Sequence, residues 1–306
     1  MTSTPSHLGG LIAASFTAFD GGGALDLDPI ERHAALLARN GVSGVFVCGS
    51  TGEGISMTTD ERMRCFQRWC EVARGGLKLL AHAGHNSLPD AQALAAHAQR
   101  MGADAIATVA PSVLRPACVE DLVDWCAAVA AHAPDTPYYY YHIPVLTSVR
   151  FDMVKFMARA QERIPTFAGL KFTDENLMEF SRCADFDSGR YNLLYGRDEI
   201  LLAGLVSGAQ GAIGSTFNYS APVYNRVIAA FRRGDMPTAM REMARARDCV
   251  QILIDFGGLP AGKAMLGLCG VDCGPVRLPL RTLPPARHRQ MQAALEASGW
   301  DDVRCK

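Results

Sequence analysis

Two side chains could carry covalent and proton-transfer chemistry, because each stands at the end of an apolar or aromatic segment. Lys171 follows the segment 167–170, and Tyr141 ends the tyrosine run 138–141. The ordinary pKa of a lysine amine is about 10.4, and burial can lower this pKa by several units. An amine whose pKa is about 7 can attack a ketone and form a Schiff base. Two alternatives stay open: Lys171 could reach the rim or pair with a carboxylate, and the tyrosines could pack in the core.

The segment 49–54, with the sequence Gly-Ser-Thr-Gly-Glu-Gly, could bind a small anion. Its glycines allow positive φ angles and bring backbone N–H groups close to an anion, while Ser50 and Thr51 add hydroxyl donors. The segment lacks the Gly-Lys-Ser/Thr ending of a P-loop, so a small carboxylate suits it better than a triphosphate. An ordinary turn with locally bonded hydroxyls is the alternative.

Polar residues also follow two later apolar segments. Asp198 and Glu199 come after segment 192–196, and Ser215 comes after segment 211–214. Two adjacent carboxylates could hold the hydroxyls of a sugar, although Asp198 could also cap the helix that starts there. Ser215 could likewise contact a ligand or cap a helix.

The composition excludes several other classes of function. Among 306 residues, 30 Lys and Arg stand against 31 Asp and Glu, so no basic excess exists for binding nucleic acid. No apolar stretch reaches the roughly 18 residues that cross a bilayer, and residues 1–6 do not resemble a signal peptide. The ten cysteines are scattered, and His82 and His85 lack helical ligand spacing, so we expect no metal site. These observations predict a cytoplasmic protein without a nucleic-acid or membrane partner.

Eight short apolar segments alternate with longer amphipathic ones, which is typical of buried parallel strands between helices. Thr58 and Glu61 form a capping-box pattern before one such helix. Eight strand–helix units predict a (β/α)8 barrel over residues 1–234, followed by a helical extension over 235–306. A doubly wound sheet is the alternative, but its early glycine fingerprint is missing. The predicted strands begin near residues 11, 44, 79, 105, 137, 167, 192 and 211, and the helices of the extension span 236–256, 260–269 and 285–298.

In such a barrel, functional groups lie at the carboxyl ends of the strands. The polar residues described above follow the second, fifth, sixth, seventh and eighth predicted strands, so they should meet at one end of the barrel. The five segments that carry them resemble, in order and spacing, the N-acetylneuraminate lyase/dihydrodipicolinate synthase family of class I aldolases. The segments are 49–53, 141–144, 169–173, 195–199 and 214–218.

The resemblance implies a role for each of these residues. Lys171 would form a Schiff base with the ketone of the substrate, and Tyr141 would relay a proton. Ser50 and Thr51 would hold the carboxylate of the substrate. The polyhydroxyl tail would be contacted by Thr173, Gly196, Asp198, Glu199 and Ser215. The resemblance also implies a homotetramer that needs no metal or cofactor.

Segments 138–147, 164–167 and 275–280 resemble the lyase branch of the family most. This likeness predicts cleavage of N-acetylneuraminate to pyruvate and N-acetylmannosamine. Leu146 stands where the synthase branch usually carries an arginine for a second carboxylate, which disfavours dihydrodipicolinate synthesis. An aldolase or dehydratase for another 2-keto-3-deoxy sugar acid, and a non-catalytic sensor or scaffold, remain as alternatives.

Overall fold

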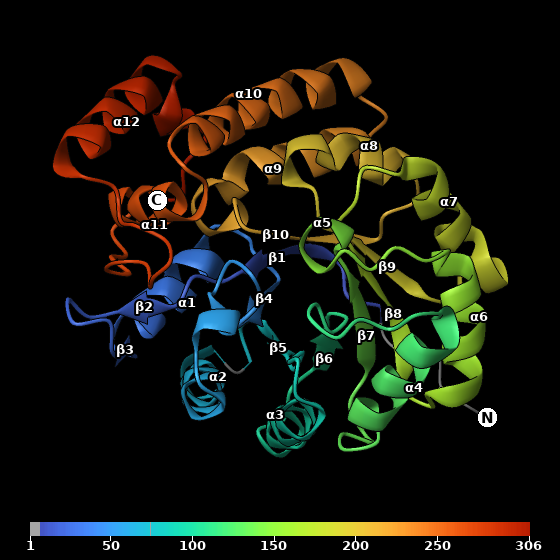
Figure 1. Cartoon of the computed structure of the whole chain (residues 1–306). Helices are drawn as coiled ribbons and strands as arrows, with labels where there is room; N and C mark the ends of the chain where they lie inside the picture. The colour runs from blue at the N-terminus through green and yellow to red at the C-terminus, as the bar shows by residue number, and fades with distance from the viewer. Residues whose placement is uncertain (1–6, 74) are drawn as a thin grey trace.

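Eight parallel strands close into a barrel, as the sequence predicts (Figure 1). The computed structural model describes residues 7–73 and 75–306. Each strand pairs with its neighbour in the chain, and β1 pairs with both β4 and β10 to close the barrel. The strands are β1 (Gly10–Ala14), β4 (Gly44–Val47), β5 (Lys78–His82), β6 (Ala105–Thr108), β7 (Tyr138–His142), β8 (Phe167–Phe172), β9 (Asn192–Tyr195) and β10 (Gly211–Gly214).

The barrel strands are apolar on both faces because both faces are covered. Alternate residues fill the barrel interior, among them Tyr139 and Tyr141 of β7. Tyr138 and Tyr140 belong instead to the outer core, which lies between the strands and the surrounding helices. The tyrosine run therefore divides into an inward pair and an outward pair, as strand alternation predicts.

A ring of helices surrounds the barrel. Thr58 and Glu61 form the predicted capping box before α2: the Thr58 hydroxyl accepts from the Glu61 amide at 3.2 Å, and the Thr58 amide donates to the Glu61 carboxylate at 2.9 Å. The helices of the ring are α1 (Pro29–Arg39), α2 (Thr59–Ala73), α3 (Leu88–Arg100), α4 (Val119–Ala130), α6 (Met153–Arg163), α7 (Leu177–Asp185), α8 (Leu201–Val206) and α9 (Phe217–Arg232).

Smaller elements lie between the barrel strands and the larger helices or follow a helix. The short helix α5 (Pro144–Thr147) follows β7, and the hairpin of β2 (Ala18–Phe19) and β3 (Leu25–Asp26) follows β1. Single 3-10 turns are η1 (Gly54–Ser56), η2 (Phe186–Gly189), η3 (Asp198–Ile200) and η4 (Trp300–Asp302).

Three further helices form the C-terminal extension, which Figure 1 shows in orange to red beside α9. They are α10 (Met236–Asp255), α11 (Leu259–Leu268) and α12 (Pro285–Ala297), and each boundary is within one residue of its predicted position. Met243, Met265 and Leu295 of the extension belong to the same apolar core as the outer ring. The division of the chain into two domains at residue 234 stays a prediction. No helix of the described residues is long and apolar enough to cross a membrane.

Candidate active site

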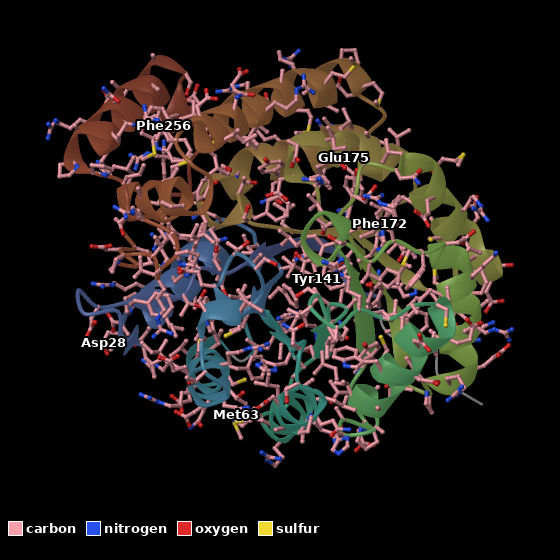
Figure 2. The ribbon with its side chains drawn as sticks, in the orientation of Figure 1. Asp28, Met63, Tyr141, Phe172, Glu175 and Phe256 are labelled. Carbon is pink, nitrogen blue, oxygen red and sulfur yellow. The ribbon has the colours of Figure 1, made fainter. Side chains whose placement is uncertain are left out.

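Lys171 and Tyr141 meet inside the barrel, at the carboxyl ends of β8 and β7. The two residues are partners in the register between these neighbouring parallel strands, so their side chains leave the sheet on the same face. The Lys171 Nζ lies 3.8 Å from the centre of the Tyr141 ring and 4.5 Å from the centre of the Phe46 ring. Figure 2 labels Tyr141 near the middle of the barrel. The structure therefore brings together the two side chains on which the predicted chemistry depends.

The surroundings of Lys171 favour a neutral amine. The residue is only 3% exposed, so it does not reach the rim of the barrel. Among the described residues no carboxylate lies within ion-pair distance of its amine, and Asp198 acts on it only through space. Burial lowers the pKa of Lys171, and its charge and hydrogen-bond interactions with Tyr141 oppose this change in part. Both alternatives for Lys171, a rim position and a carboxylate partner, are thus excluded.

Asp198 is buried, and it is held by Thr216. The amide and hydroxyl of Thr216 both donate to Asp198 Oδ2, at 2.8 and 2.7 Å. Gly214 makes room for this carboxylate, because a Cβ at that position would overlap its atoms. Burial raises the pKa of Asp198 to about 6, against the effect of the two hydrogen bonds from Thr216. Thr216 lies within segment 214–218, but no sequence pattern marks it as the partner of Asp198.

Thr173 presents a buried hydroxyl that needs a partner. Within the described part of the chain, its Oγ1 forms no hydrogen bond. Gly196 packs directly against this hydroxyl, and a Cβ at Gly196 would overlap it. A buried polar group without a partner costs about 1–3 kcal/mol, so a bound ligand that supplies a hydrogen bond would recover that free energy.

Glu199 and Ser215 are the two remaining residues of the predicted tail-binding set, and each is only half-buried. Glu199 is half-buried and forms an ion pair with Arg197 at 3.4 Å. Ser215 is half-buried, and its carbonyl accepts a hydrogen bond from the side-chain amide of Asn218 at 2.7 Å. The same amide of Asn218 donates to the carbonyl of Ala14 at 2.7 Å, which ties the segment after β10 to the end of β1.

The segment 49–54 after β4 forms a tight loop at the same end of the barrel. Two of its backbone carbonyls accept hydrogen bonds: Gly49 O accepts from the Gly54 amide at 3.1 Å, and Gly52 O accepts from the Thr17 hydroxyl at 2.7 Å. The amides of Ser50 and Thr51, by contrast, donate no hydrogen bond to any described residue. Those two amides and the neighbouring hydroxyls are therefore available for an anion.

A cavity of about 330 Å³ opens beside this loop. Ser50 is exposed and lines the cavity, together with Ile143 and Leu146 from the segment after β7. Thr51 is half-buried and follows Ser50 in the loop. The predicted carboxylate-binding residues are thus next to an open space of the size of a small ligand.

His82, at the end of β5, is a site residue that the sequence does not mark, because its spacing from His85 bears only on metal binding and otherwise predicts a structural or hydrogen-bonding role. Its ring lines the cavity and lies 6.1 Å from the Tyr141 ring, between centres. Nδ1 is 3.1 Å from the carbonyl of Cys48, whereas the buried Nε2 has no partner among the described residues. Burial, then the charge of Arg62, holds the pKa of His82 well below its usual range. His82 is therefore a neutral group beside the candidate nucleophile.

Comparisons with known proteins agree with the resemblance found in the sequence. The model of the dihydrodipicolinate synthetase family matches residues 7–298. N-acetylneuraminate lyase A of Xenopus laevis is 39% identical over 284 residues, which cover 92% of this chain and 93% of the relative. N-acetylneuraminate lyase of Sus scrofa is 38% identical over 286 residues, which cover 92% of this chain and 90% of that relative.

A solved structure extends this similarity to three dimensions. The Proteus mirabilis N-acetylneuraminate lyase matches with a TM-score of 0.93 and 37% identity, covering 96% of this chain and 99% of that chain. The family match and the identities over most of both chains confirm the predicted relationship. The chain belongs to the dihydrodipicolinate synthetase family.

Proposed function

We propose that this protein is a class I aldolase, a carbon–carbon lyase that cleaves N-acetylneuraminate to pyruvate and N-acetylmannosamine through a Schiff base. The observation that carries the proposal is the buried amine of Lys171, which has aromatic rings beside it and, among the described residues, no carboxylate within ion-pair distance. The similarity to N-acetylneuraminate lyases over more than nine-tenths of the chain supports this choice of substrate.

The reaction needs a neutral amine first and a positive charge later. The amine of Lys171 adds to the ketone of the substrate, and uptake of one proton from solvent with loss of water leaves a protonated imine. Tyr141 accepts the proton from the hydroxyl on the carbon that will become the aldehyde, and its own phenolic proton passes to the carboxylate of the substrate. The bond between that carbon and the carbon next to the imine then breaks, and its electrons move into the imine to give an enamine. Protonation of the enamine and hydrolysis release pyruvate and free Lys171.

The polar groups around this centre have separate roles in the proposal. Ser50 and Thr51 hold the substrate carboxylate, which is supported by their amides, which donate to no described residue, and by the position of Ser50 at the cavity. Anchoring the carboxylate fixes the imine relative to Tyr141, so that binding is converted into orientation. The polyhydroxyl tail is held by Thr173, Gly196, Asp198, Glu199 and Ser215.

The carboxylate of Asp198 suits a hydroxyl-rich tail, because an ionised acid accepts hydrogen bonds from sugar hydroxyls. The buried hydroxyl of Thr173, which has no hydrogen-bond partner in the described ranges 7–73 and 75–306, supports the same assignment. Leu146 lines the cavity with an apolar side chain, which disfavours a second carboxylate in the substrate. Another 2-keto-3-deoxy sugar acid would fit the same set of contacts and is the second candidate.

We also propose a cytoplasmic homotetramer. Apolar side chains stand exposed beside the cavity mouth, with Val113, Leu114 and Val145 at 75%, 88% and 63% exposure. A group of exposed apolar residues on one face is typical of a surface that another subunit covers. Light scattering during size-exclusion chromatography measures the mass directly, and a monomer at micromolar concentration would refute the assembly.

One experiment tests the chemistry. The protein is incubated with pyruvate and sodium borohydride, digested, and analysed by mass spectrometry. We expect a reduced pyruvyl adduct on the peptide that contains Lys171, and none after Lys171→Ala. Absence of the adduct from a folded wild-type protein would refute the Schiff-base mechanism. Pyruvate release from a panel of sugar acids then identifies the substrate, and no release from N-acetylneuraminate would eliminate the proposed one.

A further inference from the structure

We propose that the C-terminal extension positions the loop that binds the substrate carboxylate, with Lys263 and Arg277 as positioning residues that act through Glu53. The proposal rests on the function proposed above, in which the loop 49–54 holds that carboxylate. It assigns a catalytic purpose to helix α11 and to the connector before α12, which contribute no residue to the reaction itself.

Glu53 is the point at which the extension meets the loop. Its carboxylate is buried, and one oxygen, Oε1, lies 2.8 Å from the Nζ of Lys263 in α11. The other oxygen, Oε2, accepts a hydrogen bond from the backbone amide of Arg277 at 2.8 Å. The extension therefore contacts both oxygens of this loop residue, Oε1 through an ion pair and Oε2 through a hydrogen bond. Lys263 is fixed in turn by a hydrogen bond of 2.7 Å to the carbonyl of Pro275.

The side chain of Arg277 holds the chain on the other side of the loop. Its guanidinium donates to the carbonyl of Ser56 at 2.9 Å and to the carboxylate of Glu61 at 2.8 Å. It also donates to the carbonyl of Gly23 in the β2–β3 turn at 2.7 Å. Arg277 thus fixes the segment between the loop and α2, while Lys263 fixes the loop at Glu53.

The loop needs such support because its backbone is strained. Glu53 has a φ of 54°, and Cys48 just before the loop has a φ of 58°. Non-glycine residues adopt this left-handed conformation only where the surrounding structure holds them there. Gly54 lies so close to the carbonyl of Cys48 that a Cβ would overlap it. The direction of the Ser50 and Thr51 amides follows from this geometry.

The buried ion pair of Lys263 and Glu53 fixes the position of the loop more than it stabilises the fold. Each charge loses its water on burial, so replacing such a pair by apolar side chains of similar volume is often neutral for folding. The pair nevertheless fixes the distance and direction between α11 and the loop, which an apolar pair does not. This difference makes positioning separable from stability in an experiment.

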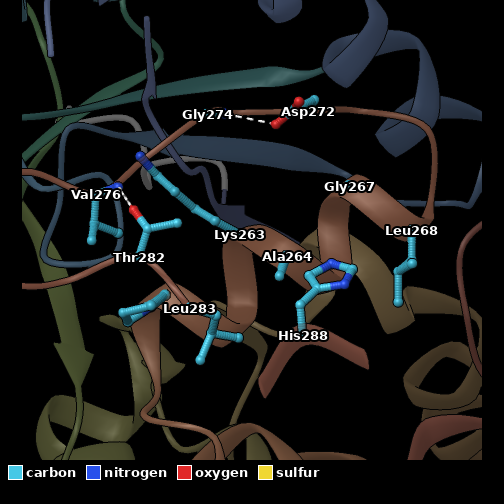
Figure 3. A pocket seen from close by; sticks show the side chains of 11 residues that line it. Lys263, Ala264, Gly267, Leu268, Asp272, Gly274, Val276, Thr282, Leu283 and His288 are labelled. Carbon is cyan, nitrogen blue, oxygen red and sulfur yellow. Dashed lines mark hydrogen bonds between the residues drawn. The ribbon is translucent and has the colours of Figure 1, made fainter. Parts of the chain in front are cut away.

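The space around Lys263 allows a substitution without overpacking. Figure 3 shows Lys263 extending from α11 toward the chain at Gly274 and Val276, along a cavity of about 470 Å³. Methionine has a similar length and no charge, so Lys263→Met removes the ion pair and keeps most of the apolar contacts. The loop then loses its link to α11, while Lys171 and Tyr141 are untouched.

The test compares two ketones in borohydride trapping on Lys171. Pyruvate carries the carboxylate that the loop would bind, and hydroxyacetone carries none. For Lys263→Met we expect the ratio of the pyruvate rate to the hydroxyacetone rate to fall about 10- to 100-fold. This is the effect of losing one charge-assisted hydrogen bond from the loop to the substrate carboxylate. Lys78→Met is the matched control: its ion pair with Asp104 has the same 2.8 Å distance but lies at the other end of the barrel. It should keep the wild-type ratio.

Each result has a distinct meaning. An unchanged ratio in folded Lys263→Met, or an equal fall for both ketones, would overturn the positioning role. If Lys263→Met fails to fold, the double variant Glu53→Gln with Lys263→Met leaves no unpaired buried charge and takes its place, with the same fall in the ratio expected. Failure of wild-type protein to trap either ketone would refute the proposed function itself, so the two failures are distinguishable.

Discussion

Asp198→Asn should stabilise the fold at neutral pH while weakening substrate cleavage. The pKa of buried Asp198 is raised from 3.8 to about 6, so the folded state holds a proton that the unfolded state releases. The stability that this group contributes is present below pH 3.8 and is lost as the pH rises to 6. At about 1.36 kcal/mol per pH unit, the ionised side chain costs the folded protein about 3 kcal/mol at pH 8.

Asparagine is neutral at every pH in this range, and it has nearly the shape of the protonated acid. Both hydrogen bonds from Thr216 end on Asp198 Oδ2, so one amide oxygen can accept both. Relative to wild type, the variant should therefore gain about 2–3 kcal/mol of unfolding free energy between pH 4 and pH 8. This gain is the change, from pH 4 to pH 8, in the difference between the unfolding free energies of the variant and the wild type. Other groups titrate in both proteins, so their contributions cancel in this difference.

The measurement is urea unfolding of both proteins at several pH values and one protein concentration. Asp301→Asn, which removes a charge from a side chain that is 79% exposed, controls for net charge. In parallel, cleavage of the sugar acid should fall about 10- to 100-fold while pyruvate trapping on Lys171 persists, because only the tail loses a charged acceptor. A stability difference that is the same at pH 4 and pH 8 would refute the reasoning.

Three further substitutions separate chemistry from packing. Tyr141→Phe should lower kcat by about 10²- to 10⁴-fold, measured as pyruvate release, and still form the borohydride adduct, because the ring remains and only the proton relay is lost. Thr173→Val should raise the unfolding free energy in urea by about 1–3 kcal/mol and raise KM for the sugar acid, since it removes a buried hydroxyl that has no partner in the part of the chain that the structure describes. His33→Gln should flatten the acid side of the stability curve. Burial lowers the pKa of His33 from 6.5 to about 4, so its contribution is present above pH 6.5 and about 3 kcal/mol is lost as the pH falls to 4; an unchanged curve in pH-dependent urea unfolding would contradict this.

The barrel could be predicted because its signals are local. Each strand is a short apolar run covered on both faces, and each run is followed by a helix with its own pattern, such as the capping box of Thr58 and Glu61. The β2–β3 hairpin carries no such signal, because each strand has only two residues and no apolar run. Its position depends on the extension, where the amide of Phe19 donates to the carbonyl of Cys273 at 3.1 Å.

The site could be predicted only in part, for the same reason. Lys171 and Tyr141 end neighbouring strands, so the fold alone brings them together. Thr216 as the donor to Asp198, and Arg277 as the donor to Glu53, join residues that no local pattern connects. The second pair is 224 residues apart in the chain. The first pair depends on how β10 lies beside β9, and the second on how the extension packs against the barrel, and short-range periodicity encodes neither.

Two lysines show how the partners of a buried amine decide its use. Lys171 and Lys263 are buried to nearly the same degree, at 3% and 4% exposure. Burial lowers the pKa of Lys263 as well, but a carboxylate at 2.8 Å opposes this change by favouring the charged form, and a carbonyl at 2.7 Å helps to fix the amine in place. Lys171 has two aromatic rings and no acid within ion-pair distance among the described residues, so burial favours its neutral form. A carboxylate placed beside Lys171 would keep the lysine amine protonated, and a protonated amine has no lone pair with which to attack a ketone.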